Sequence, residues 1–161
     1  MMMAGEETIE HHQPPQSPTP DVNVSAVKSP VQQHLPQLLI IGVRKGGTRA
    51  LLEMLNLHPS VCMVPVEVHF FDKSDNYQKG LEWYRSQMPL SRADQLTVEK
   101  SPSYFVTPEV PERVWAMNPA TKLILIVRDP VVRLLSDFAQ IEETRLSHGL
   151  PTRRFQVNRA N

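Results

Sequence analysis

The 161-residue sequence lacks three features that would each point to a class of protein. It has one cysteine, Cys62, which excludes an internal disulfide framework and a zinc site built from cysteines. No apolar run approaches the roughly 18 to 20 residues that a membrane span requires, and no apolar signal segment opens the chain. A formal net charge of zero argues against a general nucleic-acid binder, although such a total hides local basic patches. We therefore expect no nucleic-acid partner and no membrane segment in this chain.

Glycine is also scarce, and its distribution is informative. Of the six glycines, Gly42, Gly46 and Gly47 fall within one short stretch. Before them, residues 38–41 form a continuous apolar run that predicts a buried strand, and from Thr48 onward the apolar residues recur at helical spacing. A strand, a glycine loop and a helix together favour phosphate binding, because small residues let backbone N–H groups approach an anion at a helix N-terminus.

The loop differs from the nucleoside-triphosphate loop Gly-x4-Gly-Lys-Ser/Thr in the position of its lysine. Lys45 precedes both glycines of the pair, and no lysine stands between Gly47 and Thr48 to reach a terminal phosphate. The loop therefore suits a phosphate that is not part of a metal-bound triphosphate. An ordinary strand-turn-helix with incidental glycines is the alternative interpretation of this segment.

Composition divides the chain into three parts. Residues 1–36 are rich in proline, glutamine, serine and histidine, which predicts a disordered leader. Residues 37–140 carry the periodic apolar patterns of a folded α/β domain. Residues 141–161 contain few core formers, so we expect the end of a helix and a loose, divergent tail.

Within the folded part, strand-like and helical patterns alternate. Residues 61–71 predict an extended segment, interrupted by Pro65, in which Glu67 and His69 share one side. Residues 95–98 predict a short strand, and 122–127 a second buried strand, followed by Asp129 as a helix cap. Further helices are predicted over residues 77–88 and 107–117, and the packing face of the last helix would be Val131, Leu134, Leu135 and Phe138.

This alternation predicts an α/β fold with a parallel sheet. In such folds ligands bind at the carboxyl ends of the strands. Lys45, Glu67, Lys100 and Arg128 each end or follow a strand-like run, so one cleft can collect all four.

Four separated motifs carry a family resemblance. They are Gly-Val-Arg-Lys-Gly-Gly-Thr-Arg at 42–49, Glu-Val-His-Phe-Phe-Asp at 67–72, Val-Glu-Lys-Ser-Pro-Ser-Tyr-Phe at 98–105 and Val-Arg-Asp-Pro at 127–130. In this order they closely resemble the heparan sulfate glucosamine 3-O-sulfotransferases. The resemblance covers about residues 35–140 and implies a P-loop-like, three-layer sulfotransferase fold.

The resemblance implies sulfonate transfer from 3'-phosphoadenylyl sulfate to the 3-hydroxyl of glucosamine in heparan sulfate, without a metal. It assigns the 5'-phosphosulfate to the loop, where Lys45 stabilises charge on the bridging oxygen. It assigns the nucleotide 3'-phosphate to Arg128 and Ser136. The loop residues that would hold the donor are Lys45, Gly46, Gly47, Thr48 and Arg49.

The resemblance also implies roles toward the sugar. Glu67 would be the base that activates the hydroxyl, His69 would support it, and Lys100 would lie near the sulfonate and the acceptor. Asp72 would contact the acceptor sugar. For His69 a structural role is an open alternative, and for Asp72 a cap or turn role competes.

Departures from the family pattern give further expectations. Family members continue past the point that matches Gln140, so we expect a partial, truncated sulfotransferase domain of uncertain activity. The family is Golgi-lumenal, yet no signal or anchor is visible in the sequence. A non-catalytic fragment that binds nucleotide or heparan sulfate is the competing hypothesis, and a magnesium-dependent kinase is disfavoured by the missing loop lysine.

Overall fold

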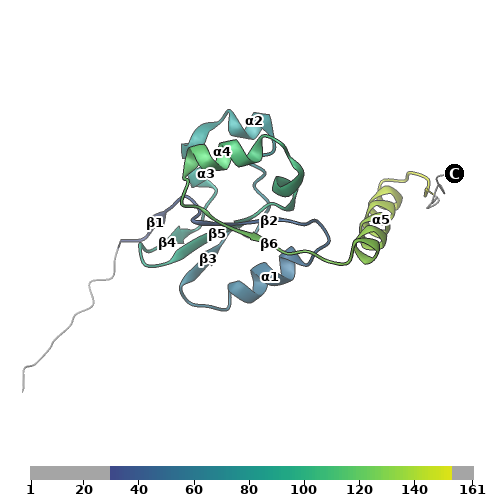
Figure 1. Ribbon diagram of the computed structural model, residues 1–161, viewed down its shortest axis with the longest axis horizontal. Helices are drawn as coiled ribbons and strands as arrows, with labels where there is room; N and C mark the ends of the chain where they lie inside the picture. The colour runs from purple at the N-terminus through teal and green to yellow at the C-terminus, as the bar shows by residue number, and fades with distance from the viewer. Residues whose placement is uncertain (1–29, 154–161) are drawn as a thin grey trace, which may run out of the picture.

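The computed structural model describes residues 30–153, which form an α/β fold around a four-stranded parallel sheet (Figure 1). The strand order places β2 in the interior, with β5 on one side and β6 at an edge. The predicted parallel sheet is therefore confirmed. In spatial order the strands are β3 (Val61–Met63), β5 (Leu96–Lys100), β2 (Leu38–Gly42) and β6 (Lys122–Leu125).

Helices lie on both faces of the sheet. Helices α2, α3 and α4 gather on one face, α1 lies on the other, and α5 stands apart beyond the end of β6 (Figure 1). A two-stranded antiparallel pair, β1 (Gln32–Gln33) with β4 (Leu90–Ser91), flanks this arrangement. The helices are α1 (Thr48–Leu55), α2 (Ser74–Tyr77), α3 (Gly80–Ser86), the 3₁₀ helix η1 (Pro102–Val106), α4 (Val110–Met117) and α5 (Pro130–Ser147).

Alternation along β2 produces two apolar cores. Leu38 and Ile40 point toward α1 and pack with Leu52, while Leu39 points to the opposite face. That second core is aromatic, and the rings of Phe70 and Tyr84 are stacked with centroids 4.3 Å apart. The loop that follows β3 is thus anchored by aromatic packing under α3 and α4.

The folded part begins earlier than the predicted boundary at residue 37. Gln33 lies in β1 and its side-chain amide donates to the carbonyls of Ser86 and Met88, both at 2.9 Å. Residues 30–36, which were assigned to the disordered leader, therefore belong to the folded part. Composition did not reveal this, because the segment is held by hydrogen bonds from a polar side chain to distant backbone carbonyls. The rest of the leader, residues 1–29, lies outside the described residues.

Two other element predictions differ from the structure. The segment 61–71 is a strand only as far as Met63, after which Pro65 interrupts the ladder and a loop follows. Helix α5 ends at Ser147, within residues 141–161, where the end of a helix was expected. Within 77–88, Gly80, with φ +80°, separates α2 from α3.

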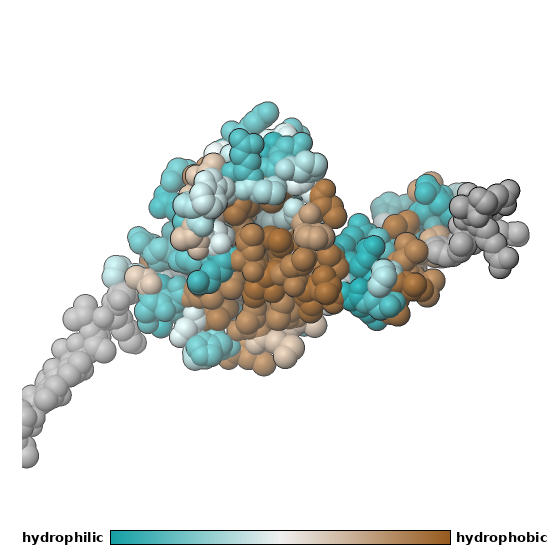
Figure 2. Space-filling view, in the orientation of Figure 1, coloured by the Kyte–Doolittle hydropathy of each residue, from teal (hydrophilic) through white to brown (hydrophobic). Residues whose placement is uncertain are grey.

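The strand predicted at 122–127 is present as β6, but its expected burial is wrong for the part of the chain that the structure describes. Leu123 is 54% and Leu125 40% exposed, because β6 is an edge strand. The expected packing face of α5 is also largely open, with Val131, Leu134 and Leu135 each about half exposed or more. Figure 2 shows the resulting apolar surface on the face where β6 and α1 lie.

Candidate active site

The carboxyl ends of the four parallel strands define the edge at which the predicted residues gather. Lys100 is the last residue of β5, and Lys45, Glu67 and Arg128 lie in the loops that leave β2, β3 and β6. Parallel strands bring these ends to one edge of the sheet. The sheet topology explains why these four residues lie at the same edge. Which of them form one cluster depends on their side-chain contacts.

The glycine loop fits tightly against the end of β6. Val43 N donates to the Ile126 carbonyl at 2.8 Å, and Gly46 N donates to the Val43 carbonyl at 2.9 Å. A Cβ on Gly46 would lie 2.7 Å from the Ile126 carbonyl oxygen. Glycine is therefore required at 46 by close backbone approach.

The first turn of α1 is open to an anion. Gly47 caps the helix in a left-handed conformation, with φ +103°, and contributes no side chain to the N-terminal amides. The first turn carries no acidic residue, and Thr48 is buried at its start. Backbone N–H groups and the helix dipole thus favour negative charge here.

The basic residues around this loop differ in their partners. Lys45 is half-buried in the loop with φ +63°. Arg49 instead forms an exposed pair with Glu53 on the next turn of α1, at 2.9 Å. Binding of the donor by Arg49 would therefore require its release from Glu53.

A second cluster joins four of the predicted residues. Lys100 forms an ion pair with Oε1 of Glu67, and Oε2 of Glu67 lies 3.3 Å from Nε2 of His69. Nδ1 of His69 lies 2.8 Å from Oδ2 of Asp72. The imidazole is thus held between two carboxylates, one of which also contacts an ammonium group.

Ser103 is a member of this cluster that the sequence prediction did not include. Its hydroxyl donates to Oδ2 of Asp72 at 2.6 Å and lies 3.2 Å from Nδ1 of His69. The Asp72 side chain is only 8% exposed, so its geometry favours holding His69 over touching a sugar. The signal was present, because Ser103 lies in the 98–105 motif in which only Lys100 received a role.

Arg128 and Ser136 lie on the other side of the glycine loop. Arg128 is exposed just before Asp129, whose carboxylate accepts from Val132 N at 2.9 Å and caps α5 as predicted. Ser136 is half-buried on α5 beside Asp137, which pairs with Arg44 at 2.7 Å. This ion pair connects α5 to the glycine loop.

Glu99 is a buried acid beneath the site. It is fully buried on the aromatic face of β5, and burial raises its pKa against the opposing effect of hydrogen bonds from its neighbours. Burial also raises the pKa values of Tyr84 and Tyr104, and the nearby charge of Glu99 is the second largest cause. The sequence prediction missed Glu99 because a carboxylate inside an apolar strand gives no periodic signal.

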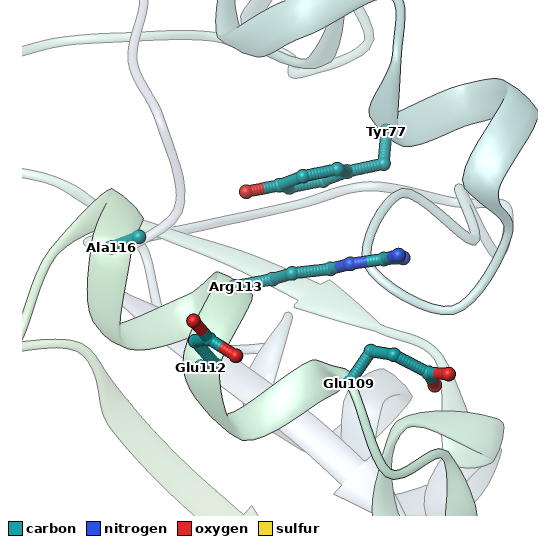
Figure 3. Close-up of a pocket in the computed structure, with 5 residues that line it drawn as sticks. All are labelled: Tyr77, Glu109, Glu112, Arg113 and Ala116. Carbon is teal, nitrogen blue, oxygen red and sulfur yellow. The ribbon is translucent and has the colours of Figure 1, made fainter.

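A separate shallow pocket of about 290 Å³ lies between α2 and α4 (Figure 3). Arg113 spans it, with its guanidinium 4.4 Å from the centroid of the Tyr77 ring and a hydrogen bond of 2.7 Å to the Phe71 carbonyl. Glu109 and Glu112 also line the pocket, so it does not suit an anionic donor or acceptor.

Residues 30–153 contain no helix that is long and apolar enough to cross a bilayer. The same residues contain no group of three or more His, Cys, Asp or Glu side chains arranged to hold a metal ion.

Comparison with known proteins places this geometry in context. The family model described as "Sulfotransferase domain" matches residues 35–157. The fold resembles a sulfotransferase from Alicyclobacillus acidocaldarius, with a TM-score of 0.59 over 72% of this chain and 60% of that one, at 22% identity. This likeness concerns the fold alone, and it confirms the expected sulfotransferase fold.

Curated relatives are more similar in sequence. The chain is 60% identical over 111 residues to heparan sulfate glucosamine 3-O-sulfotransferase 5 of Homo sapiens, covering 69% of this chain and 32% of the relative. It is 52% identical over 138 residues to heparan sulfate glucosamine 3-O-sulfotransferase 3B1 of Mus musculus, covering 85% and 34% respectively. The chain thus spans about a third of the length of the curated relatives it matches.

Proposed function

Because the chain belongs to the sulfotransferase domain family, we propose that it transfers a sulfonate group from 3'-phosphoadenylyl sulfate to the 3-hydroxyl of glucosamine in heparan sulfate. The family implies a sulfonate donor. The acceptor is taken from the names of relatives that are 50 to 60% identical, and the donor from the motif resemblance given above. The single observation that carries the proposal is the Glu67, Lys100 and His69 cluster at the edge that also holds the glycine loop.

The donor would bind at the start of α1. Backbone N–H groups of Gly47 and Thr48 suit the 5'-phosphate, since no side chain or acidic residue occupies that helix end. The N–H of Gly46, also proposed to contact the donor, would first have to leave the Val43 carbonyl, to which it donates. Lys45 would stabilise the negative charge that grows on the bridging oxygen as the S–O bond breaks. Arg128 and Ser136, beyond the loop, would hold the 3'-phosphate.

Glu67 is suited to act as the general base. Its side chain is 38% exposed, so an acceptor hydroxyl can reach it, whereas that of Lys100 is 11% exposed behind it. In the transfer the sugar oxygen bonds to sulfur, and the bond from sulfur to the 5'-phosphate oxygen breaks with its electron pair. The hydroxyl proton passes to the Glu67 carboxylate.

His69 and Lys100 would hold Glu67 in its reactive orientation. Each occupies a different carboxylate oxygen, so the group is fixed in rotation as well as in position. Lys100 would also face the sulfonate oxygens once Glu67 accepts a proton. A heparan sulfate substrate would place the activity in the Golgi lumen, as the resemblance to the heparan sulfate glucosamine 3-O-sulfotransferases implies.

Direct assay tests the proposal. The purified chain is incubated with ³⁵S-labelled donor and heparan sulfate, and the labelled position is determined after digestion to disaccharides. Glu67→Gln should reduce transfer by about 10² to 10⁴-fold, the usual contribution of a general base. Glu82→Gln, which removes an exposed carboxylate on α3, is the matched control and should leave transfer unchanged.

Calorimetry with 3'-phosphoadenosine 5'-phosphate separates binding from turnover. Binding without transfer would favour the competing hypothesis of a nucleotide-binding fragment, and it matters because the chain spans about a third of its relatives. Transfer that survives Glu67→Gln undiminished would remove Glu67 as the base.

A further inference from the structure

Three consecutive backbone N–H groups in the loop after β3 donate to buried side chains, and two of them lead to one carboxylate. Val68 N donates directly to Oε1 of Glu99 at 3.4 Å. His69 N donates at 3.2 Å to the hydroxyl of Ser101, which in turn donates to the same Oε1 at 2.6 Å. Phe70 N donates at 3.0 Å to the hydroxyl of Tyr104, a side chain whose pKa is raised by burial and also by the Glu99 charge.

The loop between these contacts has an uncommon backbone conformation. His69 adopts φ +54°, in the left-handed region that L side chains rarely occupy. Such a conformation persists only where its surroundings over-determine it. Hydrogen bonds to the residues on both sides of His69, and to His69 itself, supply that constraint.

Burying an acid at this point is unfavourable for stability. Glu99 is 0% exposed in a core of Phe70, Tyr84 and Tyr104. An apolar side chain of similar size would fill this space without desolvating a carboxyl group, and that desolvation is unfavourable wherever hydrogen bonds do not fully compensate it. A reason beyond packing is therefore needed for a carboxyl group here.

We propose that Glu99 is a positioning residue that fixes the 66–70 loop and thereby sets the orientation of Glu67 and His69 toward the acceptor. Its catalytic consequence rests on the proposed function, whereas its effect on loop geometry does not. Glu99 lies next to Lys100 in β5, so one strand end holds the loop backbone through Glu99 and the Glu67 side chain through Lys100.

The two carboxyl oxygens of Glu99 have separate partners, which provides a control. Oε1 receives the loop contacts, directly and through Ser101. Oε2 instead receives the hydroxyl of Tyr84 at 3.2 Å, and Tyr84 belongs to α3 rather than to the loop. Ser101→Ala and Tyr84→Phe thus each remove one hydroxyl bonded to the same buried group.

The test compares these two variants by kinetics and by NMR of the His69 ring, assigned with His69→Asn. Ser101→Ala should lower kcat about 10-fold or more with KM within about 2-fold, because displacing a base by a fraction of an ångström is costly. It should also shift the His69 ring signals. Tyr84→Phe should leave kcat within about 2-fold of the parent chain and the His69 signals in place.

A conservative variant completes the test. Glu99→Gln keeps an acceptor oxygen for Val68 and Ser101, so the His69 signals should stay close to those of the parent chain. Equal effects of Ser101→Ala and Tyr84→Phe on the His69 signals would overturn the proposal, as would unchanged signals in Ser101→Ala. If the parent chain shows no turnover, the proposed function fails, but the NMR comparison still decides the role of Glu99.

Discussion

The ammonium group of Lys100 contacts Glu67 from the protein side, and Glu67 faces the solvent. The side chain of Lys100 is 11% exposed and that of Glu67 38%, although Glu67 lies in a loop and Lys100 ends a strand. A substrate approaching this edge of the sheet therefore meets the carboxylate before the cation. This order suits a base that is held and oriented from behind.

Lys100→Met should impair transfer more than donor binding. Loss of the ammonium group frees Glu67 to rotate and removes positive charge from the proposed position of the sulfonate, so the rate should fall by about 10²-fold or more. The affinity for 3'-phosphoadenosine 5'-phosphate, measured by calorimetry, should change by less than about 3-fold, because the proposed nucleotide contacts lie in the glycine loop and near α5.

Lys122→Met is the matched control for that variant. Lys122 is exposed at the start of β6, at the amino-terminal ends of the parallel strands, whereas the site lies at their carboxyl ends. Its loss should leave both transfer and affinity unchanged. Equal impairment by the two substitutions would show that overall charge, rather than the contact with Glu67, governs the rate.

Gly46→Ala should weaken donor binding and stability together. The added Cβ would lie 2.7 Å from the Ile126 carbonyl and 2.9 Å from that of Val43, so the loop must move. We expect a loss of about 1 to 3 kcal/mol in the free energy of unfolding, as for other overpacked sites. Urea denaturation and calorimetry with the nucleotide measure the two effects.

Gly80→Ala provides the comparison for Gly46→Ala. Gly80 has φ +80° but open space around its Cβ position, so the cost is the conformational strain of about 1 to 2 kcal/mol alone. Nucleotide affinity should be retained, because Gly80 begins α3 and is remote from the glycine loop in sequence and fold. Loss of affinity in both variants would indicate general instability.

Glu99→Gln should flatten the pH dependence of stability. Burial raises the pKa of Glu99 above its ordinary value of 4.5, so the folded state holds the proton more tightly than the unfolded state. The free energy of unfolding contributed by this group then falls as pH rises from about 4.5 to the folded pKa. Glutamine does not titrate, so the variant should gain stability relative to the parent chain over this range.

Urea denaturation at several pH values between about 4 and 8 measures that difference. Parallel curves for the two proteins would contradict a raised pKa. A gap that widens toward low pH would have the wrong sign for a buried acid.

Arg113→Met should destabilise the helices above the sheet. The variant loses a hydrogen bond to the Phe71 carbonyl and a cation–π contact with Tyr77, which together correspond to about 2 to 3 kcal/mol. Arg85→Met, which removes a largely exposed pair with Glu82, should cost less than about 1 kcal/mol. Thermal and urea unfolding compare the two, and equal losses would contradict a specific role for Arg113.

The parts of the fold that could be predicted from sequence are those with a strong periodic or local signal. The apolar run at 38–41 became β2, the spacing from Thr48 became α1, and Asp129 caps α5 as expected. The alternation also predicted that Glu67 and His69 lie close together, as they do in the structure. Their contact arises in a loop, where His69 has a left-handed backbone conformation, and not in a strand.

Other features depend on tertiary contacts that no local pattern records. Ser103 and Glu99 gain their partners from a loop some 30 residues away in sequence. Exposure of β6 was mispredicted because an apolar run indicates a strand but not whether an element covers it. The roles of Lys45, Arg128 and Ser136 toward the nucleotide stay predictions.

The exposed apolar strip of β6 governs how the isolated chain behaves in concentrated solution. Within residues 30–153 no strand pairs with its outer side, and Leu123 and Leu125 stand open beside it. An uncovered apolar edge is a template for further strand pairing, and a formal net charge of zero supplies little electrostatic repulsion between molecules. Light scattering should therefore rise steeply with protein concentration near pH 7, and Leu123→Lys should delay that rise without touching the carboxyl edge of the sheet.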